Sequence, residues 1–460
     1  MSDSETKSDD HNGEATTTAM ATAPANEAQV ASVPQQPPEQ LKEGGYGWVV
    51  VLAAALLNAH TWGLNSSFAV FLAYYLRNNT FEGATTLGFA FVGGVSVGFA
   101  LLVSPIATIL AGHKRFGTRK TIFLGTVFET MGLIFVSSVP VPSQWFNKKR
   151  SLANACAAAG SGFGGLTYSL GTNAMIASIG LPWAFRILAI LCFVVNSICS
   201  YLIRDRNQAV GSVHIALNWQ LFKRPPFLLY QGWMIFSMIP YTALVFSIVD
   251  YCQSVGLTAS QASLVGALLN LAQGLGRPVI GLSSDSVGRL NVAGLCTAFC
   301  GIMCVTLWLF STNLATCIVF AMLAGTVAGV IWATAAPVLA EVIGLQLLPS
   351  GLSLSWIILV LPATFAEVIV LEIRQRGYRA AQLFIGFMYL AAFLFMWALR
   401  SWKLREMEAA HLNKEEREGA LRDDGVVRTA SRRQDAMERA SIATRTSLAY
   451  AKGLWSFERV

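Results

Sequence analysis

Long apolar runs with almost no charge dominate the middle of this chain. Residues 44–400 hold 19 basic and 8 acidic side chains, which is 27 charges in 357 residues. A soluble domain carries about 25% charged residues, and so few charges cannot cover a water-facing surface. We therefore expect this region to lie in lipid. The net charge of +7 then reflects basic cytoplasmic loops and does not indicate nucleic-acid binding.

Eleven segments are long and apolar enough to cross a bilayer, since a span needs about 20 residues at 1.5 Å each. Backbone groups in lipid must be paired within their own segment, so these spans are expected to be helices. The sequence thus predicts an all-α polytopic membrane protein. Its predicted spans are 48–75, 85–111, 121–141, 152–178, 183–203, 227–251, 261–282, 291–311, 314–340, 347–371 and 381–400.

Basic clusters between the spans predict which side each loop faces. With the N-terminus inside, the first cluster, at 113–120, is cytoplasmic, and Asn78 lies outside in an Asn-Asn-Thr glycosylation sequon. One crossing at 121–141 would then put the cluster at 148–150 outside and invert every later loop. We therefore interpret the chain as a twelve-helix protein that lacks one helix of its N-terminal half. A true deletion and a wrongly assigned splice site would both explain the loss.

The apolar spans fall into two groups, and the two halves of the chain contain a repeated loop motif. Lys114–Arg119 and Gly281–Arg289 both place Gly and Arg in a turn after the second span of a half, as in secondary transporters. The predicted parts are a disordered cytosolic tail (1–43), an N-terminal helical bundle (44–203), a cytoplasmic linker (204–226), a C-terminal helical bundle (227–400) and a charged cytosolic tail (401–460).

Three motifs resemble those of a known family. The pattern Gly281-x-x-x-Asp285-x-x-Gly288-Arg289 resembles the loop signature of the major facilitator superfamily. Glu43–Trp48 and Trp145–Gly160 resemble the two signatures of its monocarboxylate porter-like family. The sequences of residues 58–66 and 276–278 are most similar to the filamentous-fungal branch of that family. The resemblance implies two six-helix bundles that rock around a central site, here with about eleven spans.

The loop motif is expected to act as a conformational latch. Gly281 and Gly288 permit a tight turn, while Asp285 can cap a helix end and pair with Arg289. The first-half copy has Ala111-Gly112-His113 and no Asp, so we expect a weaker latch on that side.

Arg277 is the strongest candidate for the substrate site. A charge at mid-membrane costs at least about 2.5 kcal/mol and needs a partner or an aqueous cavity, where it suits an anion. The alternative is an arginine that snorkels to the cytoplasmic face. In the porter-like family, an Arg that precedes a Pro in this helix binds substrate. Arg277-Pro278 matches that pattern, so the resemblance implies a substrate-binding role for Arg277. Gln273 and Ser66 stand where that family has a titrating acid and a lysine, which favours a larger, less charged solute than lactate or pyruvate.

Further polar residues of the predicted spans complete the expected substrate-binding set. His60 is the histidine inside a span and can carry a proton near neutral pH, although a structural role is the alternative. The asparagines can line a cavity or bridge helices. Glu367 can replace the missing acid. The full predicted set is Arg277, Gln273, Asn270, Asn58, His60, Asn65 and Ser66.

A run of small residues, Ala157–Gly165, predicts close helix approach in lipid, either for packing alone or as a seam that moves. The eight cysteines are expected to be small packed residues, so no cofactor or metal is predicted.

The predicted function is secondary active transport of a small organic solute, monocarboxylate-like or a fungal secondary metabolite, by alternating access. No nucleotide motif or nucleophile–base constellation points to an ATPase or an enzyme. The alternatives are efflux of a biosynthetic-cluster product and a non-transporting relative inactivated by helix loss. The expected partners are a small molecule and the lipid bilayer, most simply at the plasma membrane, and the sequence identifies no accessory protein.

Overall fold

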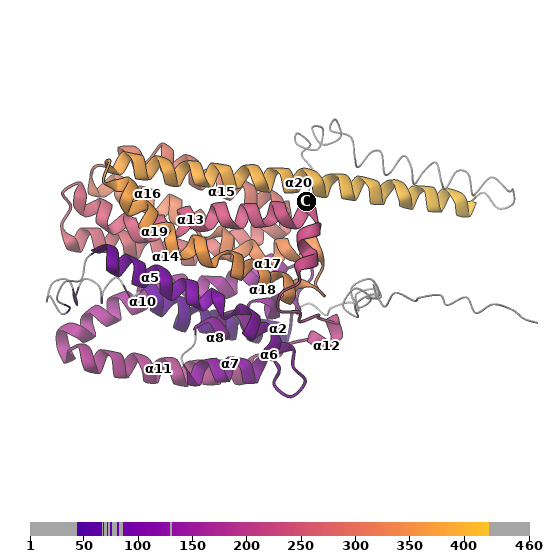
Figure 1. The fold of residues 1–460 in the computed structure, drawn as a ribbon, viewed down its shortest axis with the longest axis horizontal. Helices are drawn as coiled ribbons and strands as arrows, with labels where there is room; N and C mark the ends of the chain where they lie inside the picture. The colour runs from indigo at the N-terminus through magenta and orange to yellow at the C-terminus, as the bar shows by residue number, and fades with distance from the viewer. Residues whose placement is uncertain are drawn as a thin grey trace, which may run out of the picture. The chain divides into compact units, whose positions relative to one another are not determined.

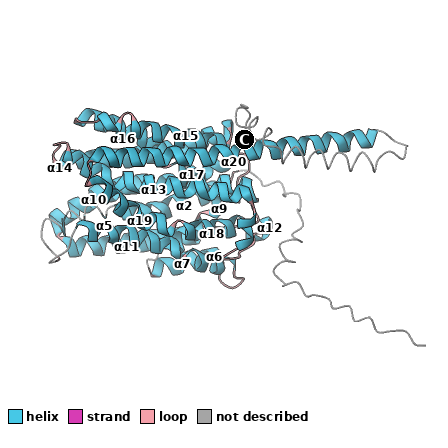
Figure 2. Cartoon of the chain, turned by 45° about the horizontal axis from the view of Figure 1, so that its top comes forward, coloured by secondary structure: helices cyan, strands magenta, loops and turns pink. Residues whose placement is uncertain are grey.

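The computed structural model describes residues 44–66, 68, 71, 74–75, 81, 86–128 and 131–422. Every regular element within these residues is a helix, which confirms the all-α class (Figure 2). Asn78, Glu129 and the tail segments 1–43 and 423–460 lie outside the described residues. The predicted division of the chain into two bundles and a linker stays a prediction, because the described residues between 44 and 422 fall into one compact unit.

The first half of this unit contains four long helical segments (Figure 1). The first is interrupted by a π-helical turn and the second by a break before Pro105. Their bounds are α2 (Tyr46–Asn58), η1 (Ala59–Gly63) and α3 (Leu64–Ser66); α5 (Thr86–Leu102) and α6 (Ser104–Gly112); α10 (Arg150–Ile179); and α11 (Leu181–Leu202).

The second half contains six long segments, and a connection with short helices α12 (Asn207–Val210) and η2 (Trp219–Lys223) precedes it. The last helix continues past the predicted span to Arg422, as expected of a charged helix that leaves the membrane. The bounds are α13 (Pro225–Ser254); α14 (Ala259–Val287); α15 (Arg289–Val305) and η3 (Trp308–Phe310); α16 (Leu314–Ala328) and α17 (Val330–Ile343); α18 (Leu348–Ile358) and α19 (Val360–Arg374); and α20 (Tyr378–Arg422).

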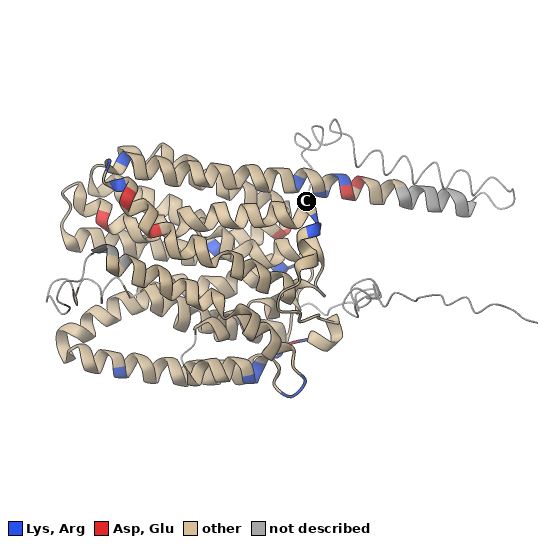
Figure 3. Cartoon of the chain, in the orientation of Figure 1, with Lys and Arg blue, Asp and Glu red and all other residues tan. Residues whose placement is uncertain are grey.

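Eight helical segments within the described residues are long and apolar enough to cross a membrane. The helices α10 and α14 are not among them, although they have 30 and 29 residues. Both carry many Gly and Ser residues, and they pack extensively against each other between the two halves. Figure 3 shows that charged residues gather near the helix ends and leave most of the helical body free of charge.

Residues 117–143 form a short helical hairpin and not the single span predicted at 121–141. Its arms are α7 (Gly117–Val127) on one side and α8 (Met131–Ser138) with α9 (Pro140–Ser143) on the other. The 11-residue α7 is about 16 Å long at 1.5 Å per residue, roughly half of the 30 Å that a crossing needs. The arms pack closely at Gly125, where a Cβ would lie 2.9 Å from Leu133 Cβ.

Both ends of this hairpin form hydrogen bonds to the same segment of the chain, residues 203–207. The Asn207 side chain donates to Thr118 Oγ1 at 3.4 Å and accepts from Gln144 Nε2 at 2.8 Å. Arg119 Nε donates to Ile203 O at 2.6 Å, and Trp145 Nε1 donates to Arg204 O at 2.7 Å. The chain therefore returns to the side that it left, so no absent span is needed to keep the basic clusters at 113–120 and 148–150 on one side.

This topology predicts a labelling pattern for single cysteines in a cysteine-free background. We expect a membrane-impermeant maleimide to modify Lys114→Cys and Lys148→Cys from the cytoplasmic side only, because both positions are exposed at the base of the hairpin. Ser178→Cys, near the far end of α10, is the control and is expected to react from outside only. Reaction of the first two positions from opposite sides would mean that 117–143 crosses the membrane.

Candidate functional site

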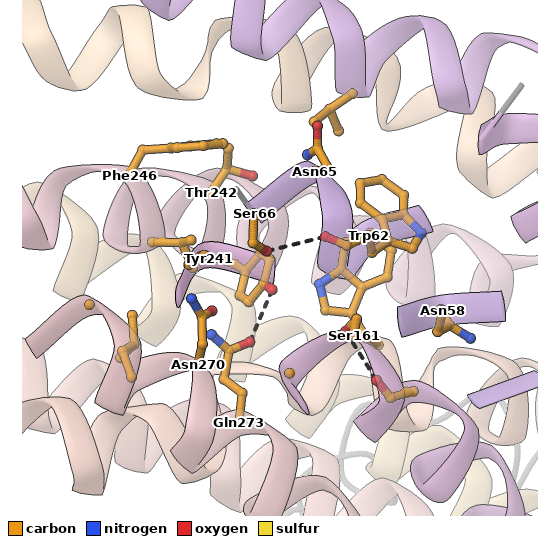
Figure 4. Close-up of a pocket in the computed structure, with 18 of the residues that line it drawn as sticks. Asn58, Trp62, Asn65, Ser66, Ser161, Tyr241, Thr242, Phe246, Asn270 and Gln273 are labelled. Atoms are coloured by element: carbon orange, nitrogen blue, oxygen red, sulfur yellow. Dashed lines mark hydrogen bonds between the residues drawn. The ribbon is translucent and has the colours of Figure 1, made fainter. Parts of the chain in front are cut away.

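A cavity of about 740 Å3 lies between the two halves, with walls from α2, η1 and α10 on one side and α13, α14 and α17 on the other. Six of the seven predicted substrate residues line it, and Figure 4 labels five of these. They are Asn58, Asn65, Ser66, Asn270, Gln273 and Arg277. Their role in binding stays a prediction, but the structure brings these six together.

Arg277 is buried in the cavity wall, with 2% of its surface exposed. It lies about 15 Å, at 1.5 Å per residue, from the end of α14 at Val287, so it does not snorkel to the headgroups. Its guanidinium bridges the two halves by donating from Nη1 to Ala158 O at 2.6 Å and to the Ser161 hydroxyl, both on α10. Nη2 donates to Gln273 Oε1 at 2.9 Å.

All of these partners are neutral. Tyr241, on α13, donates its hydroxyl to the same Gln273 oxygen at 3.0 Å (Figure 4). The same hydroxyl lies 3.5 Å from Arg277 Nη2. Among the residues that the structure describes, no carboxylate forms an ion pair with Arg277, and its Nε finds no hydrogen-bond acceptor. The cavity wall therefore holds a buried positive charge that no carboxylate of the described residues compensates.

His60 does not line the cavity, contrary to the prediction. Its ring meets the Tyr168 ring edge-on at 5.6 Å, and its Nδ1 lies 2.8 Å from Leu56 O. His60 and Trp62 are two residues apart and so point to different sides of their helical segment, with Trp62 in the cavity lining and His60 against Tyr168 of α10. The structural role, which was the alternative for this histidine, fits its surroundings better.

The cavity is closed at one end by the predicted latch residues. The Asp285 carboxylate accepts from the backbone N–H groups of Ser151 at 3.0 Å and Leu152 at 2.8 Å, in the first turn of α10. A carboxylate is favourable at a helix N-terminus, where the backbone donors are unpaired. Arg289 donates to Asn147 O at 2.9 Å and pairs with Glu341 at 2.9 Å.

The two glycines of the motif permit this contact. A Cβ on Gly281 would lie 2.5 Å from Ala155 Cβ, so only glycine lets α14 approach α10 this closely. Gly288 has a φ of 117°, a left-handed conformation that lets the chain turn directly from α14 into α15.

The first-half copy of the motif lacks an Asp, and on that side the connection between the two halves packs against α18. Its extended residues 213–216 run along α18, where Ser350 Oγ donates to Val213 O at 2.7 Å and accepts from Ile215 N at 2.8 Å. Ser353 Oγ donates to Ala216 O at 2.8 Å, and Ser104 Oγ on α6 donates to Ser353 O at 3.0 Å. Hydroxyl and backbone groups thus replace the ionic latch that the first-half motif does not provide.

The cavity opens toward the opposite end. Its lining reaches Ala177 near the end of α10, Gln253 near the end of α13 and Ala259 at the start of α14. Asp285 lies at the other end of α14 and does not line it. With the basic clusters inside, this arrangement is closed to the cytoplasm and open outward.

Comparison with known proteins agrees with this architecture. A family model described as Major Facilitator Superfamily matches residues 234–456. Probable transporter MCH2 of Saccharomyces cerevisiae is 32% identical over 407 residues, covering 81% of this chain and 86% of the relative. The chain belongs to the major facilitator superfamily. It is therefore a multi-pass membrane transporter of small solutes and not an enzyme.

Two further proteins are similar to this chain. The Fujikurins efflux protein of Gibberella fujikuroi is 24% identical over 378 residues, covering 75% of this chain and 81% of the relative. The crystal structure of the E. coli fucose:proton symporter FucP has a TM-score of 0.59 at 12% identity, covering 77% of this chain and 98% of that one. The latter likeness shows the major facilitator fold.

As in the prediction, the small residues of α10 in this major facilitator protein let it approach its neighbours closely, α14 across the two halves and α2 within the first half. A Cβ on Gly162 would lie 2.5 Å from Gly274 N on α14, and one on Gly160 would lie 1.9 Å from Ala55 O on α2. Gly162 thus lies directly on the seam between α10 and α14, which must change if the two halves rock.

The seam predicts a contrast between two glycines of α10. We expect Gly162→Ala to lower both the melting temperature and the flux, because overpacking a tight contact costs about 1–3 kcal/mol. Gly171→Ala is the matched control, since nothing lies within 4 Å of a Cβ there. Fluorescence thermal-shift and flux measurements on both variants check this. Equal behaviour of the two would contradict a tight seam.

Proposed function

We propose that this protein moves a small organic anion by alternating access through the cavity that Arg277 lines. The observation that carries the proposal is the buried guanidinium at mid-depth, whose partners are all neutral. A desolvated cation is costly until an anion joins it, and charge-assisted bonds to a carboxylate are strong and can be bidentate. An anionic solute therefore gains most of its binding free energy at this residue.

The transport is secondary, driven by a gradient of an ion or of the solute itself. Gln273 occupies the place next to Arg277 where a titrating acid would couple proton movement, and an amide does not titrate. The proposed cycle alternates between the outward-open state and a state in which the contacts of Asp285 and Arg289 with α10 and its preceding loop are broken. The plasma membrane is the proposed location.

Efflux of a biosynthetic product is the second candidate. One relative is named as an efflux protein for fujikurins, and the cavity volume of about 740 Å3 lies within the range of pockets that hold drug-sized ligands. Both candidates use the same cavity and the same cation, and they differ in solute and in direction.

Counterflow in proteoliposomes tests the proposal without knowledge of the driving ion. Liposomes that contain the purified protein are loaded with unlabelled 2-oxo acids of increasing size, and entry of the same labelled acid is followed. We expect saturable exchange of at least one acid and none of glucose, which is the neutral control. Exchange of glucose, or no acid exchange by protein that remains folded, would contradict organic-anion transport.

A further inference from the structure

The cavity wall contains a cluster of aromatic rings that both halves of the chain contribute. Trp62 lies on η1 and Phe135 on α8, whereas Trp332 lies on α17 and Trp356 on α18. The ring centroids are 5.2 Å apart for Trp62 and Phe135, 5.3 Å for Trp62 and Trp332, and 5.7 Å for Trp332 and Trp356. All four residues, here called the ring cluster, line the cavity.

Packing alone does not account for the ring cluster. Phe135 and Trp356 are buried, but Trp62 and Trp332 are only partly buried although they lie inside the protein. An apolar ring that lines a water-accessible cavity is unfavourable until a solute covers it. The partly exposed rings of Trp62 and Trp332 therefore indicate that a bound solute completes this wall.

The ring cluster is adjacent to the guanidinium. Tyr241 connects the two, because its hydroxyl lies 3.5 Å from Arg277 Nη2 while its ring centroid lies 5.9 Å from that of Trp332. Gly329, one turn before Trp332 on α17, packs against the guanidinium, where a Cβ would lie 2.6 Å from Arg277 Nε. Tyr241 and Gly329 thus place the guanidinium and the ring cluster next to each other in the cavity wall.

We propose that the ring cluster is a binding subsite for an aromatic ring, so that the transported solute is an aromatic monocarboxylate. Its carboxylate binds Arg277 and its ring packs against Trp62 and Trp332 in offset or edge-to-face geometry. This inference rests on the proposed organic-anion function and adds the solute class. The aromatic rings then set selectivity, and the cation sets the requirement for an acid.

Phenylpyruvate and pyruvate form a matched pair of probes, because they carry the same 2-oxo acid and differ by one phenyl ring. The aliphatic 4-methyl-2-oxopentanoate separates ring recognition from size. In counterflow with the full chain, we expect kcat/KM for phenylpyruvate to exceed that for pyruvate at least 30-fold and that for the aliphatic acid at least 5-fold. We expect Trp332→Leu to lower phenylpyruvate exchange about tenfold and pyruvate exchange less than twofold, with Trp332→Phe in between.

Trp183→Leu is the control, because Trp183 is exposed and lies away from the cavity, over Arg186 on α11. It should leave the ratio of phenylpyruvate to pyruvate unchanged. Pyruvate exchange that equals or exceeds phenylpyruvate exchange in the wild type overturns the ring subsite and leaves organic-anion transport standing. An equal loss for both acids in Trp332→Leu and Trp332→Phe assigns the tryptophan a structural role and also overturns the subsite. No exchange of any acid overturns the proposed function and the subsite together.

Discussion

Arg277→Gln is expected to lower organic-anion exchange by a factor of at least 100 while the protein still folds. Removal of one member of a buried, hydrogen-bonded charge pair costs about 2–5 kcal/mol, which corresponds to roughly 30-fold to several-thousand-fold in affinity. Glutamine keeps a polar group near Ala158 O and Ser161 but removes the charge that the solute would neutralise. Arg277→Lys is expected to recover little, because an ammonium cannot reproduce the planar fork that bonds α10 and Gln273 together.

Counterflow of the 2-oxo acids measures this loss, and size-exclusion chromatography in detergent checks the fold. The matched control is Arg186→Gln, since Arg186 is exposed near the start of α11, where its guanidinium carbon lies 4.9 Å from the centroid of the Trp183 ring. We expect its exchange to remain within twofold of the wild type. Wild-type exchange by Arg277→Gln would show that the solute is not bound through this guanidinium.

The second large effect is expected at the latch. Asp285→Ala removes a carboxylate that accepts two backbone N–H groups of α10 and pairs with Arg289 at 3.3 Å. Hydrogen bonds to charged groups contribute about 1.5–3 kcal/mol each, so the outward-open state should lose at least about tenfold in population relative to the inward-open state. A shifted equilibrium slows the return step, and we expect exchange to fall at least tenfold as well.

Accessibility of Ala157→Cys, which lines the cavity, reports the shift. In the wild-type background we expect an impermeant thiol reagent to react from outside, and with Asp285→Ala we expect faster reaction from the cytoplasmic side. Glu408→Ala, an exposed carboxylate on α20, is the control and should change neither rate. An unchanged accessibility pattern with Asp285→Ala would mean that this carboxylate does not hold the gate closed.

Motifs with fixed chemistry could be predicted from the sequence. The turn of Gly281, Gly288 and Arg289 is local and follows from its own residues. Arg277 could be predicted for a related reason, since an arginine within an apolar run needs a partner or an aqueous cavity. The helix end that Asp285 caps could not be predicted in this way, because it lies 134 residues away on α10.

The hairpin could not be predicted in this way. Residues 121–141 have the length and hydropathy of one crossing, and hydropathy does not distinguish a 20-residue helix from two arms of about half that length. Only the long-range bonds of Asn207 and Ile203 to both ends reveal that the chain turns back. The sequence signals were Gly125, which permits the close contact of the arms, and the failed charge pattern itself.

The side-chain directions inside the cavity also depend on contacts that the sequence does not contain. His60 and Trp62 are two residues apart on one helical segment, and only the packing of that segment against α10 and α17 shows which of them lines the cavity. Tyr241 was not identified because a tyrosine in an apolar helix has no distinguishing pattern. Its role becomes visible only when α13 brings it next to Gln273 and Arg277.

The most direct test of alternating access is the distance between spin labels at Ala177 and Ala259, measured by double electron–electron resonance in lipid. These two positions lie at the open end of the cavity on α10 and α14, one from each half, and both are exposed. We predict a longer-distance population in the absence of solute and a shift to a shorter one when saturating phenylpyruvate or pyruvate is added. A single distance that no transported acid changes would contradict a cavity that opens and closes around its solute.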